Sequence, residues 1–289
     1  MRKAQNKKES LFEKLFFVCA LTSVAAVLLI CIFLFAGGIP AMFEVGLKEF
    51  LLGTKWAPTN EPPSFGILPM ILGSLYITAG AIVIGVPVGI LTAVFMARCC
   101  PKWLYKILSP AVELLAGIPS VVYGFFGLTV LVPFVRNTFG GNGMSILTAS
   151  LLLGFMILPT IITVSESALR AVPQHYYEGA LALGATHERS VFCVLLPAAT
   201  SGILAAVVLG VGRAIGETMA VIMVAGNQTR MPKGILKGIR TLTANIVTEM
   251  AYAADLHREV LIATGVVLFV FILIINLGFA YFKRRMKNK

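Results

Sequence analysis

Residues 168–198 read ALRAVPQHYYEGALALGATHERSVFCVLLPA and separate two long apolar blocks. A block of about 20 or more apolar residues is long enough to cross the roughly 30 Å hydrocarbon core of a bilayer as a helix. The chain contains six such blocks, near residues 15–38, 70–97, 107–135, 144–167, 199–225 and 260–282. Because 58% of the 289 residues are hydrophobic and only 13% are charged, we predict an all-α integral membrane protein with six transmembrane helices.

The polar stretch between those two blocks has the start and stop signals of short helices. Pro173 suits the first turn of a helix, where its missing N–H costs nothing, and Gly184 suits the C-terminal end. We therefore predict a helix over residues 174–183, and Thr186 as the N-cap of a second helix. Small residues in the first helix and just after it would let it insert closely into a groove on another protein. These are Gly179, Ala180, Ala182 and Ala185.

The positive charge is concentrated in the segments expected inside the cell. The net charge is +11, which could indicate nucleic-acid binding. However, fifteen Lys and Arg residues fall in the segments 1–14, 98–106, 168–198 and 283–289, against eight in the expected outer segments. By the positive-inside rule this bias places both termini in the cytoplasm. Topology and anionic lipid therefore explain the charge better than nucleic acid does.

The N-terminal part is predicted to be a charged cytoplasmic tail (1–14), a first transmembrane helix (15–38) and an external loop (39–66). The first apolar block is longer than a signal peptide requires and has no small-residue cleavage site, so we expect a retained anchor. Proline and glycine residues are expected to break regular structure in the loop.

The longest outer segment, 227–259, carries five basic residues. Its residues 242–254 have apolar positions at helical spacing, which predicts a short amphipathic helix lying at the outer face. The alternative is a solvated loop that packs on the helix bundle. The basic residues form a patch that could attract an anion or an acidic partner.

Two charged residues lie inside the fifth apolar block. Arg213 is near its middle, and Glu217 follows at i+4, so on a continuous helix the two could pair. A charge at the centre of a transmembrane helix is costly, and such residues normally face the bundle interior or a wet pathway. We expect Arg213 and Glu217 either to line a substrate path or to form a structural clamp between helices.

The same cost argument applies to Glu113 in the third block and Glu166 in the fourth, which we predict to face inward. The third block also contains Gly117-Ile118-Pro119-Ser120. Gly and Pro favour a kink there. The alternative is a half-helix that begins near Ser120 and aims its free N–H groups at an anion pathway.

Signals for catalysis and for a resident cofactor are missing from the sequence. No P-loop motif for ATP is present, and the three histidines lack metal spacing. The five cysteines (Cys19, Cys31, Cys99, Cys100 and Cys193) show no ligand spacing either. We therefore expect no enzymatic activity and no bound cofactor or metal in this chain alone.

The loop resembles a known signature, the docking motif of ABC-importer permeases. That motif runs E-A-A, three residues, G, nine residues, an aliphatic residue, one residue, L-P. Here its positions are Glu178, Gly179, Ala180, Gly184, Val194, Leu196 and Pro197, with Gly replacing the first Ala. The resemblance implies that loop 168–198 forms a coupling helix, and that a separate ATPase subunit binds it and carries ATP and Mg²⁺.

Three further runs resemble the PstC-type permease of the bacterial phosphate importer. They are GIPSVVYG (117–124), GRAIGETMAV (212–221) and LHREVLIATG (256–265). The sister PstA-type permease typically continues with Ala-Pro after Gly-Glu-Thr, where this chain has Met219-Ala220-Val221. The resemblance covers 67–285 and implies a MetI-like core of five helices, type I importer architecture and one extra N-terminal helix.

This family resemblance implies a multi-pass protein of the bacterial cytoplasmic membrane that transports phosphate. Its partners would be a PstA-type permease, two PstB-type ATPases and an external PstS-type phosphate-binding protein. It also implies that Arg213 and Glu217 lie on the phosphate path, to which we add Ser120 and Glu113. Transport of sulfate or molybdate, the PstA-type role, and an ion-gradient transporter or channel are the alternatives.

Overall fold

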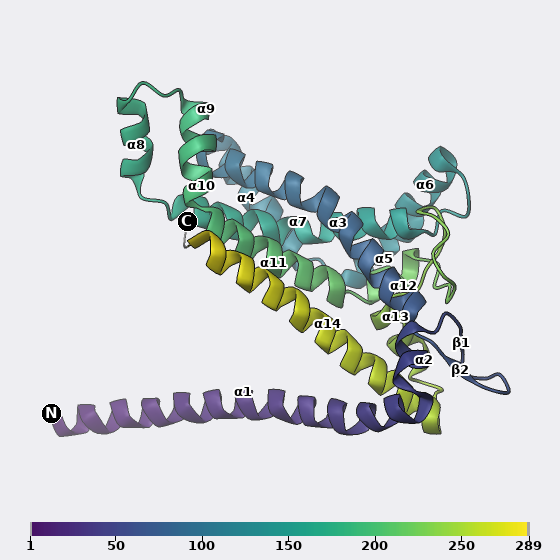
Figure 1. The fold of residues 1–289 in the computed structure, drawn as a ribbon. Coiled ribbons are helices and arrows are strands. Elements are labelled where there is room, and N and C mark those ends of the chain that lie inside the picture. The colour runs from purple at the N-terminus through teal and green to yellow at the C-terminus, as the bar shows by residue number, and fades with distance from the viewer. Residues whose placement is uncertain (1, 288–289) are drawn as a thin grey trace.

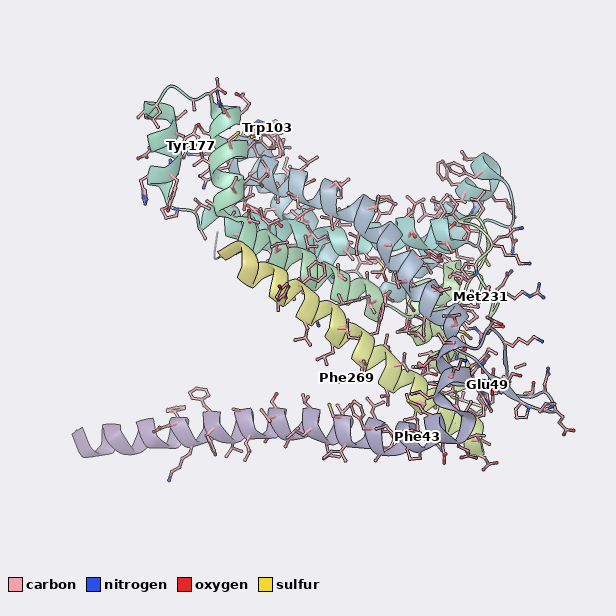
Figure 2. The ribbon with its side chains drawn as sticks, viewed as in Figure 1. Phe43, Glu49, Trp103, Tyr177, Met231 and Phe269 are labelled. Atoms are coloured by element: carbon pink, nitrogen blue, oxygen red, sulfur yellow. The ribbon has the colours of Figure 1, made fainter. Side chains whose placement is uncertain are left out.

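The computed structural model describes the backbone of residues 2–287 and the side chains of residues 12–281 (Figures 1 and 2). Most of the predicted tail 1–14 and the basic end 283–289 lie outside the described side chains. The helices are α1 (Arg2–Val45), α2 (Leu47–Leu52), α3 (Leu68–Val94), α4 (Lys102–Gly117), α5 (Ser120–Phe126), α6 (Val132–Phe139), α7 (Ile146–Arg170), α8 (Gln174–Ala182), α9 (His187–Ser190), α10 (Leu196–Ala198), α11 (Thr200–Gly216), α12 (Met219–Val224), α13 (Leu242–Glu249) and α14 (Asp255–Lys287). π-Helical turns η1 (Phe95–Cys99), η2 (Gly127–Leu131) and η3 (Val191–Leu195) follow α3, α5 and α9.

Within the residues that the structure describes, five runs of helix are long and apolar enough to span a membrane, which confirms the predicted fold class. They are Phe12–Val45, Leu68–Cys99, Ser120–Phe139, Ile146–Arg170 and Asp255–Tyr281. A sixth span results if His187–Ala198 and Thr200–Gly216, which are bent by 69°, are taken together. The two termini lie at the same end of the bundle as α8, as Figure 1 shows.

Three predicted segments differ from the structure. The first helix continues to Val45, so the predicted external loop is shorter, and it contains α2 and the antiparallel pair β1 (Trp56–Ala57) and β2 (Ser64–Phe65). The third block is interrupted after Gly117, because the residue before Pro119 avoids helical backbone angles. The fifth block ends its first helix at Gly216 instead of running unbroken to 225.

The bundle is built around α7, which packs against α3 through small residues. A Cβ placed on Gly85 would lie 2.8 Å from the Ile157 side chain, and one on Gly89 would lie 2.7 Å from Ile161. The small-xxx-small spacing of Gly85 and Gly89 therefore allows close packing of two membrane helices. Because α7 is buried by α3 on one side and α11 on another, Ile157 and Ile161 have no exposed surface.

Among the described side chains of the N-terminal helix, those near its C-terminal end contact the rest of the chain (Figure 1). There Gly38 packs against the backbone of Ala263 in α14, and the Phe35 and Phe269 rings meet edge to face at 5.9 Å. The side chains of α1 from Phe12 to Ile30 are exposed, whereas Ala41 and Met42 near its end are buried. An apolar helix exposed on all sides needs lipid or another protein around it.

A buried polar cluster closes the end of the bundle opposite α8 (Figure 1). The Glu249 carboxylate accepts hydrogen bonds from Trp56 Nε1 (2.9 Å) and His257 Nε2 (2.9 Å), and it forms an ion pair with Arg240. Burial, followed by the Glu249 charge, raises the pKa of Tyr252 beside this cluster. The cluster joins the first external loop, the 227–259 segment and the start of α14.

This arrangement changes the prediction for residues 242–254. A short helix forms there, but its polar residues Thr243, Asn245 and Glu249 are buried, whereas the apolar Val247 is exposed. The helix therefore does not lie on a surface with its apolar side inward. Partners from three other segments satisfy Glu249 inside the fold, which periodicity alone does not reveal. His257, predicted in a loop, lies in the first turn of α14.

We expect Glu249→Ala to lower the stability of the protein strongly. Removing one member of a buried ion pair typically costs about 3–5 kcal/mol, because the other charge stays buried without compensation. The measurement is thermal unfolding of the purified protein in detergent. Glu259→Ala, at an exposed position of α14, is the control and should unfold near the wild-type temperature. Equal midpoints for the two variants would contradict this account.

Candidate functional site: a docking helix and two adjacent helix breaks

The helix α8 projects from one end of the bundle, as Figure 1 shows. Pro173 precedes its first residue, Gly184 adopts φ +82 just after its end, and Thr186 caps α9 by accepting a hydrogen bond from Arg189 N. These features confirm the predicted start and stop signals. Glu178 and Gly179 are exposed, Pro197 is exposed and Leu196 is half-buried, whereas Ala180 is buried against the rest of the loop. A Cβ on Gly179 or Gly184 would meet nothing within 4 Å.

The helix α8 is held in place by contacts that the sequence did not predict. Tyr177 Oη lies 2.8 Å from His187 Nδ1, which ties α8 to α9. His187 Nε2 in turn lies 3.7 Å from Cys99 Sγ, beyond the end of α3. Arg98 donates to the Leu169 carbonyl (2.8 Å) and to Gln174 (3.4 Å). The orientation of α8 therefore depends on the α3–α4 corner.

The first helix break lies between α4 and α5. Ile118 and Pro119 both adopt extended backbone angles, so the helix is broken outright, and a new one begins at Ser120. A half-helix thus replaces the favoured kink. The Tyr123 hydroxyl donates to the Leu115 carbonyl across the break (2.9 Å), which satisfies one backbone group that the break leaves free.

The second helix break lies between α11 and α12, at Glu217 and Thr218. Glu217 has extended backbone angles, and its Oε1 accepts hydrogen bonds from Thr218 N (3.1 Å) and Ala220 N (3.2 Å). Its carboxylate therefore caps the start of α12, where negative charge is favoured. Thr243 of α13 donates to the Glu217 carbonyl (3.1 Å).

The predicted ion pair between Arg213 and Glu217 is wrong for the part of the chain that the structure describes. The i, i+4 geometry requires a continuous helix, and the helix ends at Gly216. Arg213 is half-buried and donates instead to Thr160 Oγ1 of α7 (3.2 Å). Within the described residues, no carboxylate lies within ion-pair distance of this guanidinium.

The two breaks lie next to each other because α5 packs against α12. A Cβ on Gly124 of α5 would lie 3.0 Å from Ala220 Cα, so glycine permits this close approach. Arg213 is also near enough to Tyr123 to interact with it electrostatically. The two breaks therefore lie in one region of the bundle, together with the Arg213 guanidinium and the hydroxyl groups of Thr160 and Tyr123.

The two other membrane carboxylates border one cavity of about 230 Å³. Glu166 is buried, as predicted, and pairs with Arg170 (2.8 Å), whose guanidinium also lies 4.7 Å from the Tyr105 ring centre. Glu113 is exposed, which contradicts the inward-facing prediction. Val112 is the residue of α4 that is buried, and the next side chain along a helix points about 100° away from it.

The sequence profile of the family described as "Binding-protein-dependent transport system inner membrane component" matches residues 85–288. The chain belongs to this family. Its members are permease components of ABC importers, so this chain is a membrane permease subunit and not an enzyme. Membership of this family implies a separate ATPase, a substrate-binding protein and a second permease as partners. Membership removes the alternative of an ion-gradient transporter or channel.

Two curated relatives of this permease match it over most of its length. It is 42% identical over 267 residues to the probable ABC transporter permease protein YqgH of Bacillus subtilis, covering 89% of this chain and 86% of the relative. It is 37% identical over 278 residues to the phosphate transport system permease protein PstC of Mesorhizobium japonicum, covering 87% and 84%. The PstC-type resemblance is therefore confirmed at the level of sequence.

Solved structures show that the fold is shared more widely. A chain of a bacterial alginate ABC transporter matches with a TM-score of 0.66 at 17% identity, covering 93% of the permease and 95% of that chain. A chain of the MetNI methionine ABC transporter matches with a TM-score of 0.57 at 23% identity, covering 76% and 94%. The MetNI chain is covered almost completely but covers only 76% of the permease, which agrees with a shared core and an additional N-terminal helix in this chain.

Thr160 and Tyr123 beside Arg213 were not predicted as site residues. In the sequence, Thr160 is a hydroxyl residue within an apolar block. Tyr123 lies within GIPSVVYG (117–124), one of the runs that resemble PstC-type permeases. Neither signal indicates which helix lies opposite Arg213, because that depends on how the helices pack.

Proposed function

We propose that this chain carries inorganic phosphate as one half of the translocation pathway of an ATP-driven importer. The pathway residues of this proposal are Arg213, Glu217 and Ser120 at the two helix breaks, together with the exposed Glu113 of α4. The docking residues are Glu178, Gly179, Ala180, Gly184, Leu196 and Pro197. The chain itself holds no cofactor, since ATP and Mg²⁺ bind to the ATPase.

The observation that carries this proposal is the unpaired guanidinium of Arg213. An ionised side chain within a membrane helix is expected to serve an ion or substrate pathway. Because Glu217 caps α12 instead of neutralising Arg213, the cation remains available to an anion. A guanidinium donates several hydrogen bonds in a planar arrangement that suits phosphate oxygens.

The charge supports an anionic cargo, and the likeness to PstC-named relatives supports phosphate among the oxyanions. The Met219-Ala220-Val221 continuation favours the PstC-type over the PstA-type role. The partners would then be a PstA-type permease, two PstB-type ATPases and a PstS-type binding protein. Both termini would lie in the cytoplasm, on the side where α8 docks. ATP-driven closure of the ATPases would move α8 and switch the pathway between its inward- and outward-facing states.

The test is uptake of labelled phosphate, sulfate and molybdate by cells that lack other phosphate importers. Deleting the gene for this chain should abolish phosphate uptake and leave sulfate and molybdate uptake unchanged, and restoring it should recover phosphate uptake. If phosphate uptake stays normal and uptake of sulfate or molybdate is lost instead, that oxyanion is the cargo and the proposal is wrong.

A further inference from the structure

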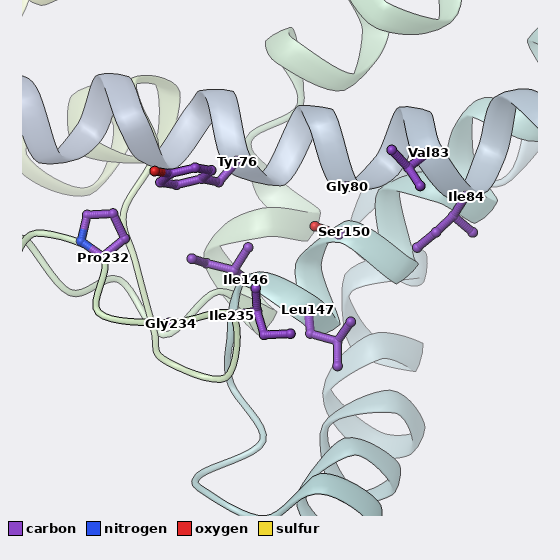
Figure 3. Close-up of a pocket in the computed structure, with 10 residues that line it drawn as sticks. All are labelled: Tyr76, Gly80, Val83, Ile84, Ile146, Leu147, Ser150, Pro232, Gly234 and Ile235. Atoms are coloured by element: carbon purple, nitrogen blue, oxygen red, sulfur yellow. The ribbon is translucent and has the colours of Figure 1, made fainter.

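An apolar groove of about 380 Å³ lies between α3 and α7 at the end of the bundle opposite α8 (Figures 1 and 3). Tyr76 to Ile84 form its α3 wall, Ile146 to Ser150 its α7 wall, and Pro232 to Ile235 its rim. The eight residue-to-residue steps from Tyr76 to Ile84 correspond to about 12 Å of helix length. The groove therefore runs from the outer loop into the depth of the membrane.

The groove is a built feature of the fold and not a gap between mobile segments. Its floor forms where Gly80 packs directly on Ser150, whose hydroxyl donates to the Ile77 carbonyl (3.3 Å). Its rim is fixed to the first turn of α7. There Leu147 N donates to the Ile235 carbonyl (2.9 Å), and Ile146 N donates to the Lys237 carbonyl (3.1 Å). These bonds satisfy N–H groups that a helix start leaves free.

Three cations lie one or two residues along the chain from the rim residues of this groove. Arg230, Lys233 and Lys237 are exposed and are interleaved with the rim residues in sequence. No Asp or Glu occurs between Glu217 and Glu249. Among the described side chains, none of the three has an ion-pair or hydrogen-bond partner. Arg240, the fourth basic residue of this loop, is instead neutralised by Glu249.

We propose that this groove binds an anionic glycerophospholipid, with one acyl chain between α3 and α7 and the headgroup phosphate against Arg230, Lys233 and Lys237. The apolar walls at membrane depth require an apolar ligand, and the unpaired cations at the mouth require a negative group attached to it. Basic sites between transmembrane helices bind anionic headgroups for this reason. The half-exposed Tyr76 ring lies in the groove wall near the rim, where aromatic side chains favour the membrane interface.

Other occupants satisfy only part of the site. A free phosphate ion or an acidic protein surface would neutralise the cations but leave the apolar groove unfilled. A second permease would fill the groove but would leave the three cations without a counter-charge unless it also supplied carboxylates.

The test uses the purified, delipidated importer complex and native mass spectrometry after incubation with nanodiscs of phosphatidylglycerol or phosphatidylcholine. Wild type should retain phosphatidylglycerol about tenfold better than phosphatidylcholine, and K233Q/K237Q should remove that preference. Lys102→Gln with Lys106→Gln removes the same charge from exposed positions at the other end of the bundle and should keep it.

A second pair of variants tests the groove itself. Val83→Trp should fill the groove and reduce retention of both lipids, because Val83 lines it and is 72% exposed. Val88→Trp, at an exposed position of α3 outside the groove, should have no effect. The proposal is overturned if K233Q/K237Q keeps the preference, or if Val83→Trp retains lipid as wild type does. It is also overturned if K233Q/K237Q loses binding of labelled phosphate while it retains lipid as wild type does.

Discussion

Arg213→Gln should reduce phosphate transport by about 100-fold or more while the importer still assembles. Glutamine can keep a hydrogen bond to Thr160 Oγ1, which Arg213 now makes at 3.2 Å, but it removes the cation. Loss of one preorganised charged or donor group costs about 100- to 1000-fold in steps that depend on it. The measurement is uptake of labelled phosphate by proteoliposomes containing the purified complex, with the composition of the complex determined on the same sample.

Two further variants test the charges of Arg213 and Glu217 separately. Arg213→Lys keeps a cation but loses the planar donors, so transport should be recovered only in part. Glu217→Gln keeps an acceptor for the backbone N–H groups of Thr218 and Ala220, so the cap on α12 should survive. Full transport by Arg213→Gln would leave Arg213 as a structural clamp to α7 and would remove the main support for an anion pathway at this site.

Gly179→Phe should abolish binding of the ATPase without unfolding the permease. The Gly179 position is exposed, and a Cβ there meets nothing within 4 Å, so phenylalanine would extend from α8 into the space that the ATPase groove must occupy. Replacing glycine within a helix also favours the helix itself, by up to about 1 kcal/mol. We expect at least a tenfold loss of co-purified ATPase and of transport-linked ATP hydrolysis.

The control for this prediction is Gly278→Phe in α14. Gly278 is also an exposed helical glycine with nothing within 4 Å of its Cβ, but it lies on a membrane-spanning helix instead of the docking loop. This variant should bind the ATPase as wild type does. Normal ATPase binding by Gly179→Phe would show that α8 docks through a different face, or that the ATPase binds elsewhere.

Local sequence signals predicted the helices and most of their ends. Apolar blocks identified the spans because crossing a bilayer requires a minimum length of apolar helix. Pro173, Gly184 and Thr186 marked the ends of α8 and the start of α9, because each acts on backbone groups within a few residues of itself. The docking motif was recognisable for the same reason, since its residues lie on one short segment.

Interactions between distant segments could not be predicted in the same way. The pairing of Arg213 with Glu217 was inferred from their spacing, but spacing determines contact only where a helix is continuous. The burial of Glu249 was also missed, because Trp56 is distant from it in sequence and comes beside it only when the first external loop folds back.

The sequence by itself determined that this protein is an ABC-importer permease with a docking motif on a short helix, since apolar length, helix caps and motif spacing are properties of contiguous residues. Only the tertiary structure decided that Arg213 faces Thr160 without a carboxylate partner, that Glu217 caps α12, and that a groove lies beneath the basic outer loop. Each of these depends on which helices become neighbours and on where a helix breaks, and both are set by packing across the whole bundle.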